Sequence, residues 1–223
     1  MMGLLVHREG MLPWQDSGNL PPRPMKPMDL WLGIYSGTGD QRLGFISART
    51  NPESRNEESG MTFALAAKIE LPVLGTITPL TLGGSGWMTN ERGLSDFDLS
   101  FRSGDHEMRV EGKVENNRLE IKLHTAGEVI PLSVPVSNNL LLSGGMGMSA
   151  FDVPLPELGK EVFVDAFDPT TLSVGKAKIA CVGKEPILVL GKMTEAFVVT
   201  TTLSGVTSKA WVDAAGEVVR LDT

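Results

Sequence analysis

The sequence predicts an all-β protein built on a long, curved antiparallel meander sheet, half-barrel or sandwich-like, with little helix. Three observations predict this class. Short runs in which apolar and polar residues alternate recur along the chain. The 25 Gly and 14 Pro residues lie mostly between these runs, as turn residues do in antiparallel proteins. No stretch has a clear helical period.

Composition narrows the functional classes. Hydrophobic residues make up 41% of the 223 residues and charged residues 21%, which is typical of a globular chain and argues against global disorder. The formal net charge of −7 offers no basic face for nucleic acid. No run of about 18 consecutive apolar residues is present, so we expect no transmembrane segment.

The N-terminal region differs from the rest. Residues 1–28 contain "LPWQDSGNLPPRPMKPM" and predict a Pro-rich flexible lead-in, and residues 29–223 predict a single antiparallel β domain. Residues 29–50 predict two strands around a turn at 37–40, residues 51–60 a polar loop, and residues 61–71 a strand with one apolar face. The first residues lack the features of a signal peptide, so the sequence assigns no compartment.

The middle of the chain predicts a hairpin with a defined register. With Asn116-Asn117 as a two-residue turn, Val114 faces Leu119 on an apolar face. Three opposite charges then meet across the strands: Glu115 with Arg118, Lys113 with Glu120, and Glu111 with Lys122. A shift by one residue would expose every apolar side chain, so burial fixes this register.

The next turn predicts an edge of the sheet. With Ala126-Gly127 as a turn, the backbone groups of Ile130, Leu132 and Val134 point at the preceding strand. The nitrogens of Pro131 and Pro135 point away from it and cannot donate a hydrogen bond. Residues 128–136 should therefore form an edge of the sheet or the start of a break in it, and an edge can receive a partner strand. The residues of this partner-edge hypothesis are Ile130, Pro131, Leu132, Val134 and Pro135.

The strands before and after this hairpin follow the same reasoning. The strand that contains residues 97–101 joins through residues 103–105 and completes a four-strand meander. Residues 137–160 predict a loop with at most one helical turn. Further strands are predicted at residues 161–167, 171–183, 187–191, 194–203, 206–213 and 216–221, with the last turn at Asp213 to Gly216.

Residues that could carry chemistry are few. Cys181 lies in an alternating strand with no histidine nearby in sequence, which is typical of a small buried hydrophobic residue. His7, His106 and His124 lack metal-ligand spacing, and Asp96, Asp98, Asp105 and Glu107 fit a solvated polar face. The Gly-rich segments lack the Lys-Ser/Thr of a phosphate loop. We therefore expect no catalytic, cofactor-binding or metal-binding residues, and no cofactor.

Aromatic residues offer one binding hypothesis. Trp31, Tyr35, Phe45, Trp87 and Trp211 either fill the core or line an apolar cavity on a concave sheet face. Filling of the core is the favoured alternative.

Four segments together resemble a known family. They are "WLGIYSGTGDQRLGFISART", "VEGKVENNRLEIKL", "FDPTTLSVGKAKIACVGKE" and "SKAWVDAAGEVVRL". In this order they resemble the β-rich region that precedes the catalytic domain of bacterial transglutaminase-like proteins, over residues 29–223. The resemblance implies a non-catalytic accessory module whose partner is a transglutaminase-like domain or another protein. It also implies an extracytoplasmic location, although the chain shows no signal peptide.

Three functional hypotheses follow. The first is a non-enzymatic binding module that acts through a protein partner or an apolar ligand. The second, by analogy of fold with bacterial lipoprotein carriers, is a carrier of lipids or other apolar molecules. The third is a cysteine-dependent transglutaminase or hydrolase acting through Cys181, which the mid-strand position of this residue disfavours.

Overall fold

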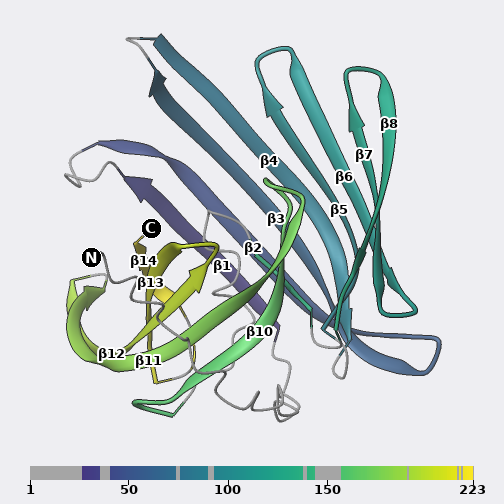
Figure 1. Ribbon diagram of the computed structural model, residues 1–223. Helices are drawn as coiled ribbons and strands as arrows, with labels where there is room; N and C mark the ends of the chain where they lie inside the picture. The colour runs from purple at the N-terminus through teal and green to yellow at the C-terminus, as the bar shows by residue number, and fades with distance from the viewer. Residues whose placement is uncertain are drawn as a thin grey trace, which may run out of the picture.

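The chain folds into two β-sheets that share a core. The computed structural model describes residues 27–35, 41–73, 76–89, 93–137, 140–143, 157–189, 191–214, 216 and 218–222. Figure 1 shows a large sheet of long strands and a smaller, strongly curled sheet that crosses one end of it. The predicted all-β class is confirmed, and the described residues include no helix.

The larger sheet is an antiparallel meander of eight strands in sequence order. Its strands are β1 (Met28–Tyr35), β2 (Arg42–Arg55), β3 (Glu58–Val73), β4 (Thr76–Thr89), β5 (Gly93–Ser103), β6 (His106–Glu115), β7 (Arg118–Thr125) and β8 (Glu128–Pro135). The Pro-rich lead-in predicted for residues 1–28 lies outside the described residues except for Pro27 and Met28, and Met28 already belongs to β1.

The predicted hairpin registers from β6 to β8 are confirmed. Val114 pairs with Leu119 and Leu123 with Ile130, with Asn116, Asn117 and Ala126 at positive φ in the turns. The three predicted charge pairs are also directly opposite one another. The ion pairs within this set instead run along the strands, for example from Lys113 Nζ to Glu115 Oε1 at 2.5 Å.

The loop predicted for residues 51–60 is wrong. β2 continues to Arg55, and β3 begins at Glu58, so that Asn56 and Glu57 form a two-residue turn with φ of 49° and 69°. The segment is polar because this end of the hairpin is exposed, with both faces in solvent. Hydrophobic alternation therefore fades although the strands continue.

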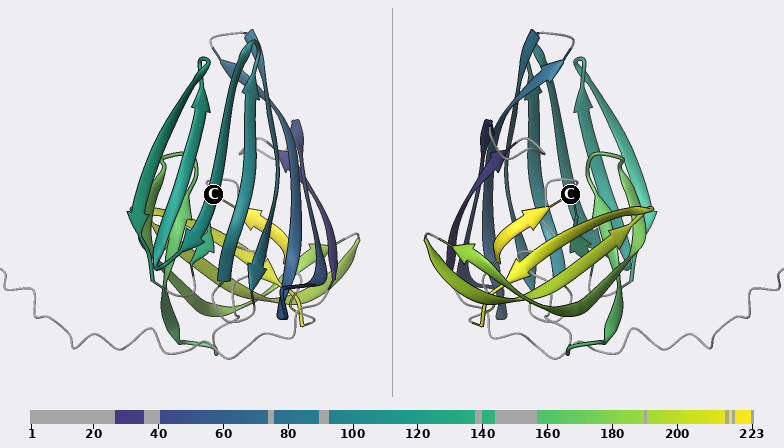
Figure 2. Two further views of the ribbon diagram at one scale, coloured as in Figure 1. Left: turned by 90° about the vertical axis from the view of Figure 1, so that its right-hand side faces the viewer. Right: turned by 90° about the vertical axis from the view of Figure 1, so that its left-hand side faces the viewer.

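The smaller sheet has six strands. They are β9 (Leu141–Leu142), β10 (Glu161–Asp168), β11 (Ser173–Val189), β12 (Lys192–Leu203), β13 (Val206–Val212) and β14 (Val218–Asp222). They lie in the order β14-β13-β12-β11-β10-β9, and β9 is parallel to β10. Figure 2 shows this sheet across the base of the larger one.

Two predictions in this half need correction. The strands expected at 171–183 and 187–191 are one strand, β11, which bends at a bulge between Cys181 and Gly183 instead of ending. The predicted loop at 137–160 contains β9, and Leu140 forms a bridge to Gly93 that links the two sheets. Residues 138–139 and 144–156 of that loop lie outside the described residues. The last hairpin is confirmed, with Gly216 N donating to Asp213 O at 3.1 Å.

One face of the larger sheet, the core face, packs against the smaller sheet. In a single row across it, one glycine lies on each side of Phe97: Phe63, Gly86, Phe97, Gly112, Ile121 and Leu132. The Phe97 ring lies over Gly112 and stacks on Phe167 of β10, with centroids 5.3 Å apart. A side chain at Gly112 would overlap that ring. The glycines therefore make room for the rings that join the two sheets.

Candidate functional site

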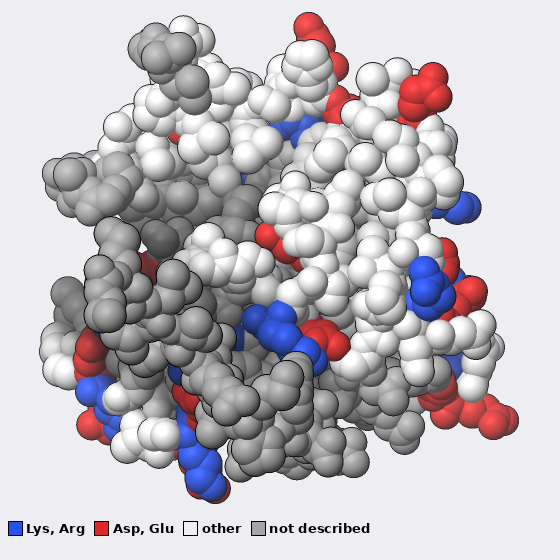
Figure 3. Space-filling model, in the orientation of Figure 1, with Lys and Arg blue, Asp and Glu red and all other residues white. Residues whose placement is uncertain are grey.

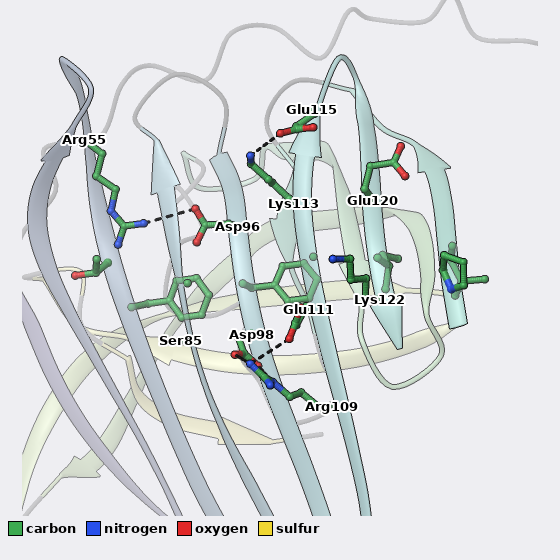
Figure 4. Close-up of a pocket in the computed structure, with 18 residues that line it drawn as sticks. Arg55, Ser85, Asp96, Asp98, Arg109, Glu111, Lys113, Glu115, Glu120 and Lys122 are labelled. Atoms are coloured by element: carbon green, nitrogen blue, oxygen red, sulfur yellow. Dashed lines mark hydrogen bonds and ion pairs between the residues drawn. The ribbon is translucent and has the colours of Figure 1, made fainter. Parts of the chain in front are cut away.

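The opposite face of the larger sheet, the charged face, carries an open groove of about 780 Å³. Figure 4 shows charged side chains from β2 and from β5 to β7 around it. The charged residues that line it are four basic, Arg55, Arg109, Lys113 and Lys122, and five acidic, Asp96, Asp98, Glu111, Glu115 and Glu120. Gly86 and Gly112, which belong to the row described above on the core face, also line the groove. Their backbone forms part of the floor between two rows of charged side chains.

Strand register explains how residues far apart in sequence meet here. Asp96, Lys113 and Glu120 form one row across β5, β6 and β7. Asp98, Glu111 and Lys122 form the next row on the same face. Successive residues of one strand point to opposite faces, so the charged residues repeat at every second position.

An ion-pair network crosses the centre of the groove. Arg109 donates to both carboxylate oxygens of Asp98, at 2.7 and 2.5 Å, and lies 3.1 Å from Glu111. His124 Nε2 lies 3.5 Å from the same Glu111 carboxylate. The hydrogen bonds from Arg109 hold the pKa of Asp98 below its ordinary value, and those to Asp98 raise the pKa of Arg109. These groups are already organised around one another.

A second cluster lies at the β2 end. Arg55 bonds Glu53 at 2.7 Å and lies 3.6 Å from Asp96. Burial raises the pKa of Asp96, although Arg55 and Lys113 oppose this shift. Arg55 also lies over the indole of Trp87, 5.2 Å from the ring centroid. The Trp87 Nε1 is buried and has no hydrogen-bond partner in the described part of the chain.

Lys122 differs from the other charged residues of the groove. Each of the other eight has an ion pair within the described chain, whereas the side chain of Lys122 has neither an ion pair nor a hydrogen bond there. Figure 4 shows its side chain directed toward β6. The groove thus combines compensated charges with one available ammonium group.

The five predicted aromatic residues do not line one cavity. Trp87 and Trp211 are buried, but Trp31 and Tyr35 are 64% and 55% exposed on β1, and Phe45 lies beside Trp31 at 5.5 Å between ring centroids. Trp211 Nε1 donates to Glu185 at 2.9 Å in the smaller sheet. None of the five lines the charged groove. The alternation pattern did not separate buried from exposed aromatic positions, because β1 has one face in solvent.

The other candidate residues are also dispersed. Cys181 is 1% exposed in the smaller sheet, whereas His106 and His124 belong to the larger one, and His7 lies outside the described residues. Asp105 and Glu107 lie at the β5–β6 turn, whereas Asp96 and Asp98 lie nearer the start of β5. Within the described ranges, no three His, Cys, Asp or Glu residues are placed to hold a metal ion.

The partner-edge hypothesis concerns β8, which is the last strand of the larger sheet, as the prolines predict. Ile130 is 42% exposed, while Leu132 and Val134 are half-buried against the core. Partner binding at this edge stays a prediction. The charged groove was missed because its charges were interpreted as solvated cross-strand pairs; the signal was present in the alternation of charged residues over three adjacent strands.

The sequence matches no protein family model and no curated protein. Among solved structures it is similar to a β-barrel-like protein of a domain of unknown function, DUF1849, from Brucella abortus. The identity is 13%, the TM-score is 0.49, and the match covers 78% of this chain and 79% of that one.

The resemblance to the region before a transglutaminase-like domain is wrong. Neither the family models nor the curated proteins include a transglutaminase-like match. The four segments consist of alternating strand residues and turn residues, a pattern that antiparallel sheets of any family require. The extracytoplasmic location was implied only by this resemblance, so it no longer has support. Within the described ranges, no helix has the length and apolar character needed to cross a membrane.

Proposed function

We propose that the protein is a non-catalytic binding module that holds an extended polypeptide segment of a partner in the groove on the charged face. The observation that carries this proposal is the lining of the groove, with four basic and five acidic side chains around a backbone floor. A polypeptide presents both charges and backbone hydrogen-bonding groups, so it matches this lining better than a purely apolar molecule does.

The preorganised ion pairs support binding rather than group transfer. Asp98, Arg109 and Glu111 hold one another in fixed positions, which lowers the entropy lost when a ligand meets them. Lys122 adds one available cation for an acidic group of the ligand. Because most of these side chains are exposed, each contact should contribute modestly, and the affinity should fall as salt increases.

The test starts from a phage-displayed library of random peptides selected on the whole protein, followed by fluorescence anisotropy of the selected peptides. We expect peptides with both charge signs. The double variant Lys113→Ala/Lys122→Ala should weaken binding roughly tenfold, equivalent to about 1.4 kcal/mol. The matched control is Lys160→Ala/Lys192→Ala, which removes the same charge just before β10 and at the start of β12, and should bind normally.

Either of two results contradicts the proposal. One is equal loss of binding in the groove variant and its control, because the lysines would then act only through net charge. The other is a selection that yields no peptide whose binding depends on the protein's groove lysines.

A second candidate is an apolar ligand on the part of the core face that the smaller sheet does not cover. Figure 3 shows a broad surface free of Lys, Arg, Asp and Glu over the strands β5 to β8 on that side. Phe101, Met108 and Leu123 are only half-buried there, and Ile130 is exposed. Binding of dodecanoate to the protein, abolished by Met108→Asp but not by Lys113→Ala/Lys122→Ala, would favour this candidate.

A further inference from the structure

The two edges of the larger sheet differ in the hydrogen-bonding groups that they leave free. In the hairpin closed by the two-residue turn at Asn56 and Glu57, Arg55 and Glu58 form the first hydrogen-bonded pair. Pairs alternate from there, so alternate residues of β2, from Thr50 to Gly44, point toward β1. Their partners on β1 are Met28, Leu30, Leu32 and Ile34.

The remaining residues of β1 therefore turn their N–H and C=O groups outward. They are Asp29, Trp31, Gly33 and Tyr35, and none is a proline. β1 is the last strand on its side of the sheet. No hydrogen bond joins these outward groups to another part of the described chain. β1 thus presents four donors and four acceptors in a row.

β8 is built differently. The same alternation, counted from the Ala126-Gly127 turn, directs Val129, Pro131, Ser133 and Pro135 outward. The two prolines lack an N–H, so only Val129 and Ser133 can donate to an added strand. Prolines at outward positions are a recognised way to protect an edge from strand addition. The β8 edge therefore offers fewer donors to an added strand than the β1 edge does.

The side chains of β1 give its edge a specific character. Trp31 and Tyr35 are 64% and 55% exposed, and the Tyr35 ring lies over Gly33 of its own strand. Trp31 Nε1 donates to Asp29 at 3.2 Å, and Arg49 donates to the other oxygen of that carboxylate at 2.8 Å. The edge thus carries two exposed aromatic side chains.

We propose that β1 pairs antiparallel with β1 of a second copy of this chain, around a two-fold axis at Leu32. In this register all four outward donors and all four outward acceptors are used. Trp31 of one copy lies opposite Gly33 of the other, the one position without a side chain. Asp29 lies opposite Tyr35. On the core face Leu32 meets Leu32, and Leu30 meets Ile34.

The register is self-complementary, which is what a two-fold contact requires. One strand pair buries less surface than a standard interface of about 1,600 Å², so the dimer should be weak and dependent on concentration. This inference does not rest on the charged groove, and its failure would leave that proposal unchanged.

The first test is sedimentation velocity of the full chain from roughly 10 µM to about 1 mM, the range in which such a contact should dissociate. We expect a shift from monomer to dimer. Gly33→Pro removes one outward donor, as the prolines of β8 do, and should leave the protein monomeric. The control Gly33→Ala also adds a Cβ, against the Tyr35 ring and opposite Trp31 of the other copy, but keeps the N–H, and should weaken the dimer less than Gly33→Pro does.

The second test fixes the register. In Leu32→Cys, the two introduced thiols face each other across the axis within disulfide distance, and mild oxidation should give a covalent dimer. In Leu30→Cys, the thiol lies opposite Ile34 and should cross-link far less. A monomer at every concentration, an unchanged dimer in Gly33→Pro, or faster cross-linking of Leu30→Cys would overturn the proposal.

Discussion

The two faces of the eight-stranded sheet are made by the same strands yet carry different side chains. On the core face, a row of alternating rings and glycines locks the larger sheet to the smaller one through the Phe97–Phe167 stack. The neighbouring residues of the same strands point to the charged face, where carboxylates and basic groups surround an open groove. The difference teaches that a single residue step along a strand separates the side chains that pack in the core from those that surround the groove.

Substituting one glycine on each face tests this difference between the core face and the charged face. Gly112→Ala on the core face would place a Cβ 2.2 Å from Phe97 Cζ, with the ring held by Phe167, so we expect a loss of about 1–3 kcal/mol in the free energy of unfolding. Gly83→Ala on the charged face meets nothing closer than Ser100 Oγ at 3.4 Å and should be neutral or slightly stabilising. Urea denaturation measures both changes.

Equal destabilisation by the two alanines would break the comparison, because it would show that the effect comes from the strand backbone and not from the face. A Gly112→Ala variant as stable as the wild type would show that the ring stack is not constrained.

Local patterns were sufficient for the fold class and for the registers from β6 to β8. The turns at Asn116-Asn117 and Ala126-Gly127 each lie between clearly alternating strands, so a short segment carries all the necessary information. The turn at Asn56-Glu57 lies among residues exposed on both faces, and no alternation marks it. The bulge at Cys181 also depends on neighbouring strands, and the sequence pattern there suggested two strands.

The site was harder to predict, because it depends on contacts between distant segments. Arg55 and Asp96 are 41 positions apart and meet only when β3 and β4 are placed between them. The buried or exposed state of Trp31 and Trp87 depends on which side chains cover them, and the period of a single strand does not contain that information. The parts of the prediction that failed are those that needed the register of several strands at once.

Two carboxylates on the charged face should respond to pH in opposite ways. The bonds from Arg109 lower the pKa of Asp98, so its contribution to stability is present above the ordinary pKa of about 3.9 and is lost as pH falls through the lower folded value. Burial raises the pKa of Asp96, so its contribution is present below the ordinary pKa and is lost as pH rises through the folded value.

The expected changes are small, because both groups are partly exposed. Asp98→Asn should lower the free energy of unfolding at pH 7 by less than about 1 kcal/mol, and this deficit should shrink below about pH 4. Asp96→Asn should be as stable as the wild type or more so at pH 7. Urea denaturation of both variants at pH 7 and below about pH 4 measures these changes in the free energy of unfolding. The same pH response in the two variants would contradict the assignment of opposite causes.

The central claim is that the charged face is the recognition surface. The most direct test is to titrate ¹⁵N-labelled protein with a peptide from the selection and to follow its amide chemical shifts. We predict the largest changes at the groove residues Asp96, Asp98, Lys113 and Lys122, and small changes on the uncovered core face. Changes centred on Phe101, Met108 and Leu123, with the groove amides unchanged, would contradict the account.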